Sequence, residues 1–116
     1  MHELSIALEL ADVASAEAER TAARCVIAVH VKVGPLSGVV KDALLFSFDA
    51  VIEGTSLAGA RLLIEETQVR TWCPRCREEH MLLDVSRRRC PVCASPTPRL
   101  TSGDELQLVG LEIGTA

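Results

Sequence analysis

Two Cys-x-x-Cys pairs constrain this chain more than any other feature of its sequence. They are Cys73-Pro-Arg-Cys76 and Cys90-Pro-Val-Cys93, with thirteen residues between them. Zn²⁺ prefers four soft or borderline ligands, such as cysteine thiolates, arranged in a tetrahedron. Each Cys-x-x-Cys pair can form a turn that presents two thiolates to one ion at about 2.3 Å. The proline after each first cysteine fixes φ at about −65°, which suits a tight turn. We therefore predict a structural zinc site with Cys73, Cys76, Cys90 and Cys93 as its ligands.

Two other chemistries use the same cysteines. Iron in the same four-thiolate cage is the main alternative metal. A thioredoxin-like redox pair is disfavoured, because the motif is present twice and neither copy lies in a βαβ pattern. A zinc ion held by four protein thiolates has no open position for water, so it folds the chain and does no catalysis. No Ser/His/Asp set, paired carboxylates or phosphate-binding loop stands out, and we predict that the chain is not an enzyme.

The segment that bears the cysteines is short and differs in charge from the rest. Residues 69–102 number fewer than the roughly 40 below which a domain usually needs a metal or disulfide, so zinc would supply much of the folding free energy. This segment holds seven arginines against three acidic residues, whereas the remainder holds five basic and thirteen acidic residues. We expect a zinc-binding domain at 69–102 and a second domain formed by residues 1–68 plus 103–116.

Hydrophobic periodicity predicts two helices in the larger domain. Apolar residues recur every three or four positions from Glu3 to about Ala18, which indicates an amphipathic helix. A second helix is predicted to follow Ser37-Gly38 and to stop at Gly54. Its apolar face would carry Val40, Leu44, Phe48, Val51 and Ile52.

Three strands complete this domain. Alternating β-branched residues predict a strand at 24–33, and strands are also predicted at 60–69 and 104–113, the last with a bulge at Val109-Gly110. The whole pattern indicates an α+β fold, with two helices on a three-stranded sheet and an inserted zinc-ribbon module that holds the four paired cysteines.

The fifth cysteine and two histidines have simpler interpretations. Cys25 shares the alternating phase of Ile27 and Val29, so we expect a buried strand thiol that acts as a small hydrophobe. His30 lies on the opposite face of the same strand and is expected to face solvent or a neighbouring side chain. Because four thiolates complete the zinc cage, we expect His80 to be exposed and not to bind metal.

The cellular location is predicted from two features that the sequence does not show, a long apolar run and a basic signal region at its start. The longest apolar stretches fall well short of the roughly 20 residues that a membrane span needs. The start, MHELSIALELAD, carries acidic residues in place of a basic signal region. We therefore expect no membrane partner and a reducing, cytoplasmic location.

The first three residues offer a second metal chemistry. Histidine at position 2 is too bulky to favour removal of the initiator, so Met1 should keep its free amine. That amine, the amide and imidazole of His2 and the amide of Glu3 could hold one metal in a plane of four nitrogens. Such a set selects Ni(II) or Cu(II) over tetrahedral zinc, and binding weakens as pH falls because amide protons must leave. The alternative is a frayed surface histidine.

Several segments together resemble the HypA/HybF family of hydrogenase maturation factors, which handle nickel. They are Met1-His2-Glu3-Leu4-Ser5, VGPLSGV at 33–39, ALLFSF at 43–48, Gly54-Thr55, Gly59-Ala60, and Gly103-Asp104-Glu105-Leu106 after the two cysteine pairs. In one respect the chain departs from common zinc knuckles, which carry glycine after the second cysteine. Here Arg77 and Ala94 occupy those places.

The resemblance implies a nickel metallochaperone. It would bind Ni(II) through His2 and the backbone nitrogens of Met1 and Glu3, hold a structural zinc on its four paired cysteines, and deliver nickel to the large subunit of [NiFe]-hydrogenase. The implied partners are a nickel-handling GTPase and that large subunit, and some members also serve urease. A homodimer is a further possible assembly, since the sequence does not reveal the oligomeric state.

Two alternatives come from other classes of protein. A zinc-ribbon nucleic-acid-binding module could use Arg75, Arg77 and Arg87-Arg88-Arg89 on phosphates. The acidic remainder and the presence of only three aromatic residues count against it, and we expect no nucleic-acid partner. The other alternative is a zinc-stabilised adaptor with an inert N-terminus. The arginines could dock an acidic partner or simply form solvated surface.

Overall fold

A computed structural model describes residues 2–97 and 99–114 of this chain. The chain divides into two compact units. The first contains the described parts of Met1–Lys32, Gly38–Glu65 and Gln107–Ala116, and the second contains Val33–Ser37 and the described part of Glu66–Leu106. The predicted division into a nickel-binding domain (1–68 plus 103–116) and a zinc-binding domain (69–102) stays a prediction.

Two helices form one layer of the first unit. Helix α1 (Glu3–Arg20) buries Ile6, Ala7, Leu10, Ala11 and Ala14, a three-and-four spacing that places them on one stripe. Helix α2 (Lys41–Ile52) packs against α1 and buries Leu44, Phe48 and Ile52. The prediction that Val40 belongs to the apolar face is wrong, because Val40 is the N-cap residue, has extended backbone and is 60% exposed. No helix among the described residues is long and apolar enough to cross a bilayer.

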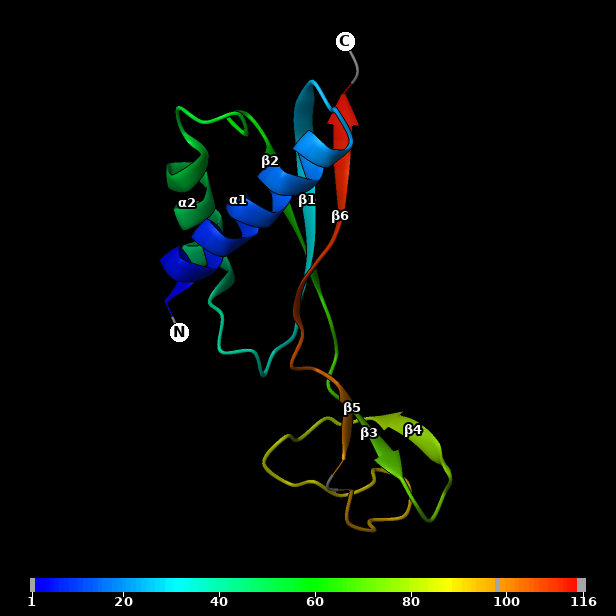
Figure 1. The fold of residues 1–116 in the computed structure, drawn as a ribbon. Coiled ribbons are helices and arrows are strands. Elements are labelled where there is room, and N and C mark those ends of the chain that lie inside the picture. Colours follow the sequence, from blue (N-terminus) through cyan, green and yellow to red (C-terminus); the bar gives the residue numbers. More distant parts are fainter. Residues whose placement is uncertain (1, 98, 115–116) are drawn as a thin grey trace. The chain divides into compact units, whose positions relative to one another are not determined.

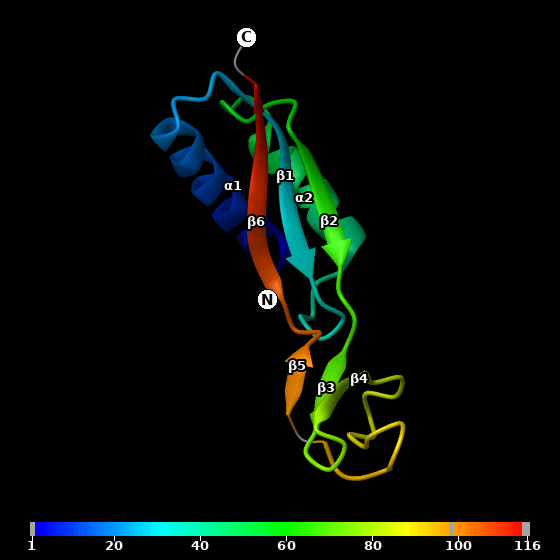
Figure 2. The ribbon, with the colours of Figure 1, turned by 90° about the vertical axis from the view of Figure 1, so that its right-hand side faces the viewer.

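The second layer of this unit is a three-stranded sheet in the order β2-β1-β6. Its strands are β1 (Cys25–Val33), β2 (Arg61–Glu66) and β6 (Leu106–Gly114). Strands β1 and β2 run in the same direction, as α2 between them allows, and β6 runs the opposite way (Figure 1). Both helices cover the same face of this sheet (Figure 2), which confirms the predicted α+β layer.

Cys25 is exposed, so the prediction of a buried thiol is wrong. The buried positions of β1 are Val26 and Ala28 in its first half but Val29, Val31 and Val33 in its second half. The alternation therefore changes phase in the middle of the strand. If the alternation of Val29, Val31 and Val33 is extended back to the start of the strand, Cys25 is wrongly assigned to the buried face.

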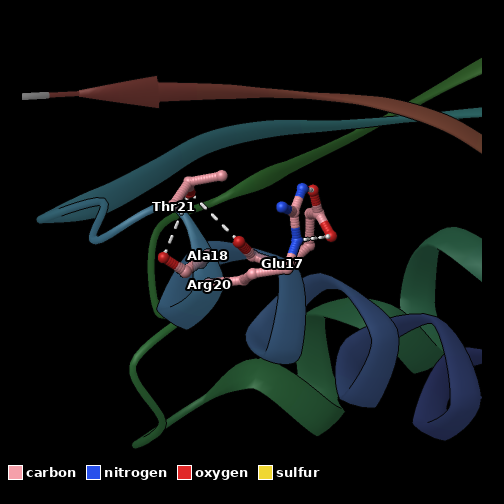
Figure 3. Close-up of polar contacts among 4 residues, drawn as sticks. All are labelled: Glu17, Ala18, Arg20 and Thr21. Atoms are coloured by element: carbon pink, nitrogen blue, oxygen red, sulfur yellow. Dashed lines mark hydrogen bonds and ion pairs between the residues drawn. The ribbon is translucent and has the colours of Figure 1, made fainter.

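The end of α1 is closed by local polar contacts, drawn in Figure 3. The Thr21 hydroxyl donates to the carbonyls of Glu17, at 3.0 Å, and Ala18, at 3.2 Å. The Arg20 guanidinium pairs with the Glu17 carboxylate, and this contact lowers the pKa of that carboxyl. The same two carbonyls also accept the Thr21 N–H, at 3.1 Å, and the Ala23 N–H, at 2.9 Å, so the threonine hydroxyl adds a second donor to each.

The second unit contains a smaller sheet that the sequence patterns did not predict. Strand β3 (Arg70–Cys73) pairs antiparallel with β4 (Glu78–Met81) on one side and with β5 (Leu100–Ser102) on the other. In the register of β3 and β4, Cys73 lies opposite Glu78 and Thr71 lies opposite His80. The strands have only three or four residues, and β3 and β4 carry charged side chains, so neither alternation nor hydrophobicity marks them.

Two glycines let separate segments of the second unit touch. The Gly34 N–H donates to the Glu105 carbonyl at 2.8 Å, and the Leu36 N–H donates to the Gly103 carbonyl at 2.7 Å. A Cβ at Gly34 would lie 2.2 Å from the Gly103 oxygen, and one at Gly103 would lie 2.9 Å from the Val69 Cα. Gly103 also has φ of +119°, a value that L side chains rarely adopt.

This close approach generates a stability prediction. Gly34→Ala should destabilise the second unit by about 2 kcal/mol or more, because the new methyl meets backbone that cannot move aside. Gly38→Ala is the matched control: its φ is +79° but nothing lies within 4 Å of the added Cβ, so the cost should be only about 1 kcal/mol. Urea unfolding followed by far-UV circular dichroism measures both, because Gly34 belongs to the second unit and Gly38 to the first. Equal losses would contradict the packing argument.

Candidate metal centre

The second unit brings the four paired cysteines to one point. Their sulfur atoms all lie within 4.8 Å of one another. The Sγ atoms of Cys73 and Cys93 are 3.5 Å apart, and those of Cys76 and Cys90 are 3.8 Å apart. Four sulfurs at about 2.3 Å from a central zinc lie about 3.8 Å from each other. The sulfur cluster therefore has the size that a tetrahedral zinc site needs.

The two cysteine turns have matching backbone geometry. In the first, the Cys76 N–H points at the Cys73 sulfur (3.3 Å) and the Arg77 N–H donates to the Cys73 carbonyl (2.8 Å). In the second, the Cys93 N–H points at the Cys90 sulfur (3.4 Å) and the Ala94 N–H donates to the Cys90 carbonyl (2.9 Å). Backbone N–H groups aimed at sulfur stabilise thiolates.

Each turn ends in the left-handed conformation that glycine usually supplies. Arg77 has φ of +58° and Ala94 has φ of +61°. The departure from the common knuckle sequence therefore changes the residue type but not the backbone path. Each residue carries the steric cost of a Cβ close to the following carbonyl.

The thiols differ strongly in acidity. Hydrogen bonds with the hydroxyl and backbone of Ser95 lower the pKa of Cys93 to about 6. The pKa of Cys76 is raised to about 12 by its hydrogen bond with Cys93, by burial and by the neighbouring thiols. A metal binds thiolates, so binding must displace protons from this set and the affinity must fall as pH falls.

Two threonines and a histidine of the second unit have buried polar atoms. Thr71 and Thr97 are fully buried, and the Thr71 hydroxyl donates to the Arg99 carbonyl at 2.8 Å. The expectation that His80 is exposed is wrong: it is half-buried in β4, with its Nε2 atom buried and unpaired among the described residues. His80 is not among the side chains that gather at the cluster.

The predicted nickel ligands lie at the start of α1, and Met1 lies outside the described residues. His2 is the exposed N-cap of this helix, and its carbonyl accepts the Ile6 N–H at 3.3 Å. Glu3 is the first helical residue, and its Oε2 accepts the Val40 N–H at 3.3 Å. Sequence reasoning assigned Glu3 only a backbone role; the contact with the start of α2 joins segments far apart in the chain, which no local pattern could show.

Comparison with known proteins decides the family. The profile described as "Hydrogenase/urease nickel incorporation, metallochaperone, hypA" matches residues 1–113. The chain belongs to the HypA family. The predicted resemblance is confirmed, and the family comprises maturation factors and metallochaperones, not enzymes.

Curated relatives and solved structures agree over nearly the whole chain. Hydrogenase maturation factor HypA of Chloroflexus aurantiacus is 47% identical over 97% of this chain and 98% of its own length. The HypA of Salmonella typhimurium is 37% identical over 97% of this chain and 96% of its own. The solution structure of the Ni metallochaperone HypA from Helicobacter pylori superposes with a TM-score of 0.69 at 25% identity, covering 97% of both chains.

The left-handed residues generate a prediction about this HypA-family chain. Ala94→Gly should stabilise the second unit by about 0.5–1 kcal/mol, because Ala94 is exposed and the change removes only backbone strain. Ala50→Gly is the matched control: Ala50 is exposed within α2, so the same substitution should destabilise by about 1 kcal/mol. Thermal unfolding of both variants gives the sign. A loss of stability in Ala94→Gly would show that its side chain has another role.

Proposed function

We propose that this chain binds Ni(II) at its N-terminus and delivers it for the maturation of [NiFe]-hydrogenase, with urease as a second class of recipient. The ligands would be the Met1 amine, the His2 amide and imidazole, and the Glu3 amide. The observation that carries the proposal is the position of His2 as the N-cap of α1. The first N–H groups of a helix have no intrahelical partner, so the amides of His2 and Glu3 are available to a metal.

The charge balance of such a site suits a helix start. A cation alone is disfavoured there, because the helix dipole places partial positive charge at the N-terminus. Two deprotonated amides cancel the two charges of Ni(II), and the complex then carries no net charge. The Glu3 carboxylate, held by the Val40 N–H, fixes the backbone that bears two of the four nitrogens. This bond gives the short N-terminal segment one tertiary anchor.

We further propose that the sulfur cluster holds a structural zinc on Cys73, Cys76, Cys90 and Cys93. The S···S distances and the backbone N–H groups aimed at sulfur support this assignment. Zinc would supply folding free energy on the order of 10 kcal/mol or more. Free thiol ligands require a reducing compartment, which supports the expected cytoplasmic location.

Delivery requires partners, and the family membership supports a role among hydrogenase maturation components. The partners we propose are a nickel-handling GTPase and the immature large subunit of the hydrogenase. Self-association into a homodimer is the third proposed contact, and sedimentation of the zinc-loaded chain tests it. All three proposed contacts rest on membership of the HypA family.

Nickel titration tests the N-terminal site. His2→Ala, and a form with residues added before Met1, should both lose the high-affinity nickel while keeping about one zinc. His30→Ala is the matched control, since His30 lies on β1 and should not affect nickel binding. Nickel binding should also weaken as pH falls, because amide protons compete. Equal nickel binding by all forms would exclude this site.

Cysteine substitution tests the zinc assignment. Cys73→Ser should lose the zinc and the near-UV signal of Trp72, while the far-UV signal of α1 and α2 persists. Cys25→Ser makes the same change at an exposed cysteine outside the cluster and should keep both. Zinc content by elemental analysis gives the readout. Unchanged zinc in Cys73→Ser would contradict the assignment.

A further inference from the structure

The second unit carries more positive charge around the cysteine turns than its acids there can balance. Six exposed arginines lie on these turns and the loops beside them: Arg75, Arg77, Arg87, Arg88, Arg89 and Arg99. Among the described residues none of the six has a carboxylate within ion-pair distance, although Arg87 interacts electrostatically with the Asp84 carboxylate, and Arg70 in β3 is paired with Glu79. The other acids within 69–102 are Glu78 and Asp84, so these residues carry a net charge of +4. Glu66, Asp104 and Glu105, near the ends of the unit's long segment, lower the net charge of the whole unit to +1.

The backbone that bears these arginines is well fixed. The Arg88 carbonyl accepts the Thr97 N–H at 2.8 Å, and the Arg99 carbonyl accepts the Thr71 hydroxyl at 2.8 Å. The Arg89 side chain donates to the Ala94 carbonyl at 3.2 Å. Thr71 and Thr97 are themselves fully buried. The charges are therefore displayed by an ordered scaffold, which lowers the entropy cost of binding.

Large apolar side chains lie among the same loops. Leu83 is 83% exposed and precedes the arginine run, and Val92 is 70% exposed at the tip of the second cysteine turn. Leu82, the neighbour of Leu83, is the buried side chain of its loop, so Leu83 is not needed to fill the core. Exposed aliphatic groups beside uncompensated charges are typical of surfaces that meet another protein.

The arginines act together electrostatically. A unit of roughly 45 residues has a radius of gyration of about 9 Å. This radius is close to the Debye length of about 8 Å at physiological ionic strength. The charges are therefore only partly screened from one another and attract an acidic partner as a group.

The geometry points to a docking site for an acidic polypeptide segment of a partner protein, formed by the six arginines with Leu83 and Val92. We call this set the arginine surface. Nucleic acid is the other polyanion to consider, but no aromatic side chain is exposed in the described part of this unit and Trp72 is half-buried. Aliphatic groups favour a segment that carries apolar side chains between its acids.

A second copy of the chain fits less well, although its first unit is acidic. A contact between the basic surface of one copy and the acidic surface of another must close into a two-fold dimer or a ring, or it yields open chains of molecules. A separate acidic partner has to meet no such geometric condition. The inference concerns a different unit from the proposed nickel site and does not depend on it.

The test uses the zinc-loaded full chain and a labelled synthetic peptide of repeated Glu-Glu-Leu. Arg88→Glu should weaken peptide binding about tenfold, and Leu83→Ser about fivefold. Arg24→Glu makes the same charge change on the first unit and should leave binding unchanged, as should Phe46→Ser for the apolar change. Nickel binding should be unchanged in all four variants, so this test is independent of the nickel test.

Three outcomes would overturn the inference. The first is equal binding by Arg88→Glu and Arg24→Glu, which would mean that only the net charge matters. The second is tighter binding of single-stranded DNA than of the peptide with no effect of Leu83→Ser, which would favour nucleic acid. The third is concentration-dependent self-association that Arg88→Glu abolishes, which would assign the arginine surface to a second copy of the chain.

Discussion

The convergence of four sulfur atoms is the constraint on which the second unit depends. Among the described residues, the buried apolar side chains of this unit are Val33, Val69 and Leu82, together with Cys73 and Cys90. Three aliphatic side chains bury too little surface to offset the chain entropy of such a unit. The short strands β3, β4 and β5 bring the cysteine turns together, and the cysteine turns stabilise the pairing of these strands. A metal on the cysteines would turn this mutual support into a stable fold.

Much of this architecture could be predicted from the sequence, because strong periodicity and fixed spacing report local structure well. The stripe of apolar residues in α1 predicted a helix that the structure extends to Arg20, and the spacing of the cysteines predicted the cluster. Short elements defeated the same reasoning. Strand β3 has four residues, among them Arg70 and Cys73, and its pairing partners are set by tertiary contacts.

Two of the three errors share one physical cause, which is extrapolation of a local pattern past the point where it holds. Cys25 was assigned by the phase of Val29, although the buried face changes within β1. Val40 continued the apolar stripe of α2 in sequence, but it lies before the first helical turn, where helical spacing has no meaning. His80 was judged by the completeness of the thiolate cage, whereas its burial depends on its place in β4, opposite Thr71.

The contact between Thr67 and Glu105 has a consequence for how this fold can vary. These residues lie near the two ends of the long segment of the second unit, and the Thr67 hydroxyl donates to the Glu105 carboxylate at 2.8 Å. An inserted segment whose ends already meet imposes no stretch on the chain that receives it. Loop-closure entropy rises only slowly with length, by about 0.6 kcal/mol per doubling. Evolution is therefore free to change the length of the loops between these two residues, provided that the four cysteines and the contact of Gly103 with Gly34 and Leu36 are kept.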